Sequence, residues 1–229
     1  MSQIHFIGGE KGGVGKSVMA RLLAQYWIDR NLPFAGADGD SSHGALLRHY
    51  GDFSQAVDLT AIDSADQILD RALGADRRVL VDLPAQSARA LSTWLLGANV
   101  LSLARELGTP ITFWHVTDGG FASVAQVEKA LDAYGSAAAH VVVKNLARSK
   151  DFSQLEASAV TAKLEAVSGK LIELPELDAN AMYKVDSAGL SFWAAAHAQG
   201  DALRLLERER VKLWLGKAYA QLDSLGDGI

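Results

Sequence analysis

Cysteine is absent from the 229 residues of this chain, and proline occurs only four times. Without cysteine the chain can form neither disulfides nor thiolate-ligated metal or iron–sulfur sites. A hydrophobic content of 49% argues against a disordered protein. No apolar run reaches the roughly 20 residues that span a bilayer, and no signal-like segment precedes the first apolar stretch. We therefore expect a cytoplasmic protein without a membrane partner.

An excess of positive charge is also missing, since 22 lysines and arginines face 27 aspartates and glutamates, for a net charge of −5. The chain as a whole is therefore not attracted to nucleic acid, and any DNA binding depends on a local basic patch. The length suits one α/β domain over residues 1–229.

Short apolar, β-branched runs alternate with helical patterns along the chain. This alternation predicts the α/β class, with a doubly wound, mostly parallel sheet flanked by helices. The expected strands are 3–8, 33–38, 56–62, 77–83, 110–117, 140–145 and 170–174. The expected helices are 15–31, 65–74, 87–108 with a break near Gly97, 123–134, 152–168 and a C-terminal helix over 200–225. Ligands of such sheets bind beyond the carboxyl ends of the strands.

Residues 10–17 read E-K-G-G-V-G-K-S and lie between the first expected strand and the first helix. The glycines let backbone N–H groups turn towards an anion that also faces the helix N-terminus. In the phosphate-binding pattern G-x-x-x-x-G-K-[ST], the lysine reaches the β- and γ-phosphates and the hydroxyl ligates Mg²⁺. Here Glu10 replaces the first glycine. We expect ATP or ADP to be bound by Gly12, Gly13, Val14, Gly15, Lys16, Ser17 and Val18, with Ser17 on the metal.

The form K-G-G-x-G-K-S resembles the deviant Walker-A P-loop ATPases of the ParA/MinD family. The resemblance implies that Lys11 acts catalytically across an ATP-bound homodimer, where it contacts the phosphates of the partner. The segment A-D-G-D-S-S-H after the second strand resembles the family's D-x-D segment, in which Asp40 would orient the attacking water. The family usually continues with Pro-Gln, whereas this chain has Ser41 and Ser42.

Further positions follow from the same resemblance. The run R-V-L-V-D-L-P at 78–84 looks like a Walker-B strand, so Asp82 would hold Mg²⁺ through a water, and residues 84–87 would sense the γ-phosphate. Asn145 ends the sixth strand, where an amide can match adenine, and Pro175 begins a loop that flanks adenine in the family. Both residues also fit simple turns at strand ends.

The C-terminal helix has an apolar face beside a basic stripe. Packing against the sheet is the simplest account of the apolar face. The stripe, made of Arg204, Arg208 and Lys212 with Arg210 and Lys217 nearby, allows contact with the DNA backbone. Attachment to a membrane surface is a third account, which the acidic residues of the helix disfavour.

Together these features predict an enzyme that hydrolyses ATP slowly and dimerises when ATP is bound. Its partner would be nonspecific DNA, a DNA-bound adaptor or both, in plasmid or chromosome partition, DNA transfer or the positioning of other cargo. Two alternatives stay open: a P-loop ligase or kinase that acts on a small molecule, and a nucleotide-dependent interaction module without hydrolysis.

Overall fold

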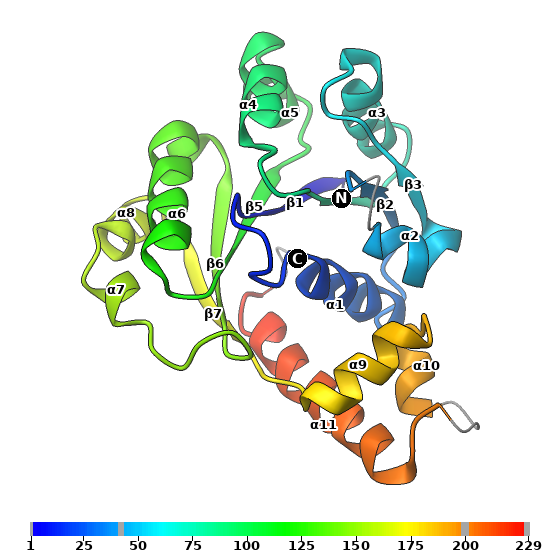
Figure 1. The fold of residues 1–229 in the computed structure, drawn as a ribbon. Coiled ribbons are helices and arrows are strands. Elements are labelled where there is room, and N and C mark those ends of the chain that lie inside the picture. Colours follow the sequence, from blue (N-terminus) through cyan, green and yellow to red (C-terminus); the bar gives the residue numbers. More distant parts are fainter. Residues whose placement is uncertain (1, 41–43, 198–201, 227–229) are drawn as a thin grey trace.

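The computed structural model describes residues 2–40, 44–197 and 202–226, which form a seven-stranded, entirely parallel sheet in the order β3-β2-β4-β1-β5-β6-β7 (Figure 1). The predicted fold class is confirmed. The strands are β1 (Gln3–Gly8), β2 (Phe34–Asp38), β3 (Ser54–Ala56), β4 (Arg78–Asp82), β5 (Ile111–Thr117), β6 (Ala139–Asn145) and β7 (Lys170–Leu174).

Helices cover both faces of the sheet. Figure 1 shows α3, α4 and α5 on one side and α1, α9, α10 and α11 on the other. The α-helices are α1 (Lys16–Asp29), α2 (Ala45–Tyr50), α3 (Ile62–Leu73), α4 (Ala88–Gly97), α5 (Val100–Glu106), α6 (Phe121–Tyr134), α7 (Ser153–Glu156), α8 (Val160–Ala166), α9 (Ala179–Ser187), α10 (Phe192–His197) and α11 (Leu205–Asp223), and short 3₁₀ turns are η1 (Gly51–Phe53) and η2 (Gly135–Ala137).

The side chains of neighbouring residues in the central strands pack into two different hydrophobic cores, one on each face of the sheet. In β1 the side chain of Ile7 joins the core under α1, whereas Phe6 joins the core under α3 and α4. Trp114 and Phe113 divide in the same way in β5. This follows from the two-residue period of a strand that is buried on both faces. The chain leaves β1 for β2 on one side and later reaches β5 on the other, so the switch point lies at the end of β1.

The predicted strand over 56–62 is wrong. The strand β3 ends at Ala56, because the carboxylate of Asp58 accepts hydrogen bonds from the N–H and the hydroxyl of Thr60, at 2.8 and 2.7 Å, and turns the chain. Ile62 then begins α3 with its side chain 72% exposed. The short helices α2, α9 and α10 lie in segments for which the sequence pattern predicts no element.

Two long predicted helices are each interrupted. The expected break near Gly97 is confirmed, because Asn99 adopts a left-handed conformation between α4 and α5. The helix expected over 152–168 is divided into α7 and α8.

The C-terminal helix is shorter than the predicted 200–225. It begins at Leu205, where the Glu207 carboxylate accepts a hydrogen bond from the Arg204 N–H at 2.7 Å and thereby caps the first turn. Residues 202–204 are not helical, and 200 and 201 lie outside the described residues. The predicted apolar face is buried, with Val211 and Leu222 fully covered. Among the described helices, none is long and apolar enough to cross a membrane.

Candidate nucleotide-binding site

The loop between β1 and α1 has a backbone that only glycine adopts without strain. Gly13 and Gly15 have φ angles of 77° and 107°, in the left-handed region. At Gly15 a Cβ atom would lie 2.2 Å from Nδ2 of Asn145, so any side chain would also collide there. The helix α1 begins at the next residue, Lys16, and its unpaired N–H groups therefore face the concave side of the loop.

Lys16 is folded over this loop. Its side chain is buried, and Nζ donates a hydrogen bond to the carbonyl of Lys11 at 3.1 Å. Burial lowers the pKa of Lys16, while the charges of Asp82, Glu10 and Asp40 act to raise it. The charges of three carboxylates therefore act on the ammonium at the place where the loop would receive phosphate oxygens.

Asp82 lies at the carboxyl end of β4 and is only 2% exposed. Burial, together with the charge of Asp38, raises the pKa of Asp82 to about 7. A hydrogen bond from Ser17 and the positive charge of Lys16 act to lower the same pKa. Within the part of the chain that the structure describes, neither carboxylate oxygen has a hydrogen-bond partner of good geometry. A buried carboxylate without a partner is costly, and a divalent cation beside Ser17 would compensate it.

The donor set fits Mg²⁺ that is bound jointly with phosphate. Among the described residues no group of three or more His, Cys, Asp or Glu side chains is arranged to hold a metal by itself. Mg²⁺ is commonly bound by one or two protein oxygens together with waters and substrate phosphates. Ser17 and Asp82 would supply the protein oxygens.

The two aspartates after β2 have different environments. Asp38 is buried beside Asp82 in the sheet register, and its carboxylate accepts hydrogen bonds from the N–H groups of Asp40 and Leu47, both at 3.1 Å. Burial raises the pKa of Asp38, against these hydrogen bonds. Asp38 therefore connects the segment after β2 to the start of α2. Asp40 lies two residues beyond the end of β2 and is half-buried. Ser41 and Ser42, which stand where the family usually has Pro-Gln, lie outside the described residues.

Lys11 lies on the same loop and contacts its own chain. Its ammonium forms an ion pair with Asp118 after β5, and its N–H donates to Oε1 of Gln126 at 3.1 Å. Burial acts to raise the pKa of Asp118, but hydrogen bonds from Lys11, Ser123 and a backbone N–H hold it below its ordinary value. The Lys11 side chain is still 41% exposed. The partner at Asp118 is a contact that the sequence pattern does not predict.

Asn145 and Pro175 both make structural contacts. Asn145 is buried, its Nδ2 donates to the carbonyl of Val14 at 2.7 Å, and its Oδ1 accepts from the N–H of Ala147 at 3.0 Å. The carbonyl of Pro175 accepts a hydrogen bond from the indole of Trp214 at 2.7 Å. Asn145 therefore anchors the glycine loop to the end of β6. Contact of Asn145 or Pro175 with adenine stays a prediction.

Truncation of Asn145 tests this supporting contact. We expect Asn145→Ala to lower the free energy of unfolding by about 1–3 kcal/mol, because the buried carbonyl of Val14 loses its donor, and to weaken ATP binding. Asn145→Asp is the matched comparison, since it keeps an acceptor for Ala147 but cannot donate to Val14. Urea unfolding and an ATP titration measure the two effects. Unchanged stability and affinity in Asn145→Ala would contradict the assignment.

Glu10, which stands at the usual first glycine, connects the loop to the next segment. Its carboxylate accepts a hydrogen bond from the N–H of Ala88 at 2.5 Å, at the start of α4, and its carbonyl accepts one from the N–H of Gln86 at 3.3 Å. The replacement of the first glycine of the pattern by Glu10 is the feature of the sequence that signals the contact with Ala88. The glycine loop is therefore bonded directly to the segment expected to sense the γ-phosphate.

Comparisons with known proteins agree with this geometry. The fold matches MinD from Aquifex aeolicus, with a TM-score of 0.54 and 10% identity over 94% of this chain and 97% of that one. It also matches a nucleotide-binding protein from Archaeoglobus fulgidus in complex with ADP, with a TM-score of 0.54 and 17% identity over 82% and 86% of the two chains. The resemblance to the ParA/MinD family is confirmed. This fold places the glycine loop at the switch point of the sheet.

Sequence relatives extend along most of the chain. A TraL protein from Escherichia coli is 25% identical over an alignment of 241 positions, which covers 98% of each chain. A MobD protein from Acidithiobacillus ferrooxidans is 25% identical over 181 residues, covering 76% of this chain and 78% of MobD. No family model matches the chain.

Proposed function

We propose that the chain is an ATP-dependent dimerisation switch of the ParA type that binds ATP with Mg²⁺ and hydrolyses it slowly. The observation that carries the proposal is the buried carboxylate of Asp82, which lacks a hydrogen bond of good geometry among the described residues and lies beside Lys16 and Ser17 at the glycine loop. This arrangement leaves the site incomplete without a cation and an anion. The ADP complex of the similar Archaeoglobus fulgidus protein supports a nucleotide as the ligand.

Each residue of the site has a distinct task in this proposal. The N–H groups of the loop and of α1 bind phosphate oxygens, and Lys16 supplies positive charge to them. Ser17 and Asp82 hold the metal, which neutralises phosphate charge when bound. Asp40, at the rim, orients the attacking water and accepts its proton.

Lys11 makes the nucleotide state a dimerisation signal. In the structure its charge is neutralised by Asp118, yet its side chain remains partly exposed at the surface. In an ATP-bound dimer Lys11 would exchange Asp118 for the phosphates of the partner subunit. ATP carries more negative charge than ADP, so ATP stabilises the dimer more strongly.

Two observations favour DNA or a DNA-bound adaptor as the partner. Four cationic side chains of the α11 region are exposed, namely Arg204, Arg210, Lys212 and Lys217. One of them, Lys212, pairs with Glu209 at 2.7 Å, so the stripe is partly neutralised. The relatives TraL and MobD have names used for transfer and mobilisation proteins, which favours DNA transfer among the settings considered.

DNA binding and ATP turnover test the proposed partner together. We expect ATP-dependent binding to nonspecific duplex DNA that weakens steeply with salt, and slow phosphate release that requires Mg²⁺. Changing Arg204, Arg208 and Lys212 to glutamate is expected to abolish DNA binding and to leave nucleotide affinity unchanged.

The matched control has the same change at Arg71, Arg105 and Lys170, which lie on other elements. No DNA affinity of the wild type at low salt would overturn the DNA proposal. Transfer of phosphate to a small molecule would favour the ligase or kinase, and an absence of turnover would favour the module without hydrolysis.

A further inference from the structure

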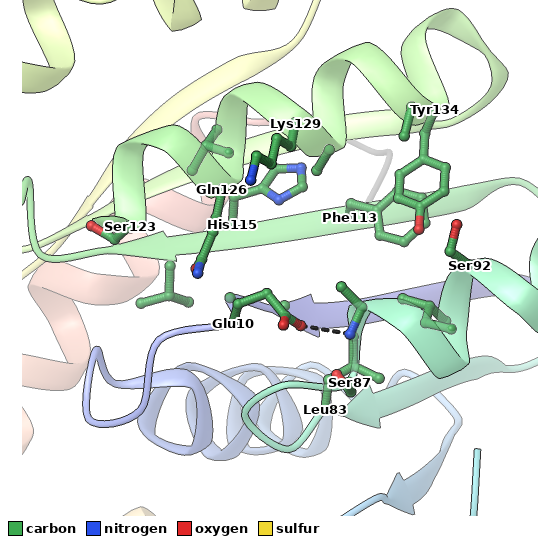
Figure 2. Close-up of a pocket in the computed structure, with 18 residues that line it drawn as sticks. Glu10, Leu83, Ser87, Ser92, Phe113, His115, Ser123, Gln126, Lys129 and Tyr134 are labelled. Atoms are coloured by element: carbon green, nitrogen blue, oxygen red, sulfur yellow. Dashed lines mark hydrogen bonds between the residues drawn. The ribbon is translucent and has the colours of Figure 1, made fainter. Parts of the chain in front are cut away.

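A cavity of about 210 Å³ adjoins the glycine loop, between α4 and α6 and above the ends of β1 and β5 (Figure 2). Its walls are mostly apolar and include Leu83, Leu91, Phe113 and Val127. The Figure 2 view shows the side chain of His115 beside this space, below Lys129. The nucleotide proposal assigns no role to the cavity.

The hydrogen bonds of two buried histidines fix where their protons lie. Nε2 of His140 lies 2.9 Å from the carbonyl oxygen of Gly135, which can only accept, so Nε2 carries the proton. Nδ1 of neutral His140 is then an acceptor, and it lies 2.9 Å from Nε2 of His115, which must donate to it. Neutral His115 therefore has no proton on Nδ1.

Both rings remain neutral at physiological pH. Burial lowers the pKa of His115 to about 3, with a smaller effect from His140, and burial also lowers the pKa of His140. His115 is only 6% exposed and lines the cavity, and its Nδ1 has no hydrogen-bond partner among the described residues. The cavity thus presents one ring nitrogen that can accept a hydrogen bond and that no described residue meets.

The size and shape of the cavity indicate what supplies the donor. A water molecule would satisfy the nitrogen but occupies only about 30 Å³ of liquid volume, whereas a dry cavity of about 150 Å³ holds benzene in another protein. Phe113 stacks on Tyr134, with ring centres 4.6 Å apart and planes at 10°, and lies nearly parallel to His115. These rings give the site a flat aromatic side.

We propose that this cavity binds a small, mainly apolar molecule of one or two rings that donates an N–H or O–H to Nδ1 of His115. Gly9 and Glu10 belong to both the cavity and the glycine loop. The site therefore lies next to the nucleotide, but its binding chemistry does not depend on ATP.

Indole and its isostere indene test the proposal on the full chain without nucleotide. Indole has an N–H donor and indene has none. We expect indole to bind about 3- to 10-fold more tightly, as one neutral buried hydrogen bond predicts. In ¹⁵N spectra of the histidine rings, indole is expected to shift the Nδ1 resonance of His115, and indene to leave it near its free position. Equal affinities, or no binding of indole at millimolar concentration, would overturn the proposal.

Two variants locate the binding. Ala130 lines the cavity on α6, so Ala130→Leu should fill it and reduce indole affinity at least about tenfold, whereas Ala122→Leu on the exposed side of the same helix should not. His115→Phe should remove the preference for indole over indene. Retention of full indole affinity in Ala130→Leu would contradict the proposal, and the wild-type comparison of the two probes decides it if a variant fails to fold.

Discussion

The Lys16→Ala protein is expected to bind ATP at least about 100-fold more weakly than the wild type. Lys16 is buried over the glycine loop among the charges of Asp82, Glu10 and Asp40. A charge-assisted hydrogen bond contributes about 1.5–3 kcal/mol, and the ammonium can make two with phosphate oxygens. Removing it also leaves the carboxylates uncompensated, which adds repulsion towards the nucleotide. Isothermal titration with ATP and Mg²⁺ measures the loss.

The matched control is Lys170→Ala, which removes an exposed lysine at the start of β7, outside the glycine loop. We expect it to keep ATP affinity close to that of the wild type. Lys16→Ala with wild-type affinity would show that the glycine loop is not a phosphate site.

The second large effect is expected on turnover. Asp40→Ala should bind ATP but hydrolyse it about 100-fold or more slowly, as is typical when a positioned acid–base group is lost. Asp40 stands at the rim, held by Asp38 through its backbone N–H at 3.1 Å. Phosphate release in single-turnover experiments, with the ATP affinity measured alongside, gives the result.

Asp52→Ala is the control, because this carboxylate is exposed in η1. Its turnover is expected to equal that of the wild type. If Asp40→Ala also hydrolyses ATP at the wild-type rate, the attacking water is oriented by another group.

Local chemistry explains which parts of the fold could be predicted. Both β1 and β7 have the predicted bounds, because each is a run of strand formers between clear turn residues. The glycine loop is a local pattern as well. The expected strand at 56–62 is wrong, since the turn in which the Asp58 carboxylate accepts hydrogen bonds from Thr60 outweighs the β propensity of the residues around it.

Contacts between distant segments could not be predicted. Lys11 meets Asp118 across 107 residues, and Asn145 meets Val14 across 131 residues. Nothing in the local pattern around either residue specifies these partners, which depend on the order of strands in the sheet. The same holds for the cavity, because His115 and His140 become neighbours only when β5 pairs with β6.

The central claim is that ATP brings two copies of this chain together through Lys11. Light scattering of the Asp40→Ala protein at one concentration, with ATP or with ADP, tests it most directly. We predict a dimer with ATP and a monomer with ADP, and loss of the ATP dimer when Lys11→Ala is added. The ATP dimer should be retained when Lys170→Ala is added, since Lys170 lies at the amino end of the edge strand β7, whereas the glycine loop follows the carboxyl end of the central strand β1. A protein that dimerises with ATP equally well without Lys11, or has the same mass with both nucleotides, would contradict the account.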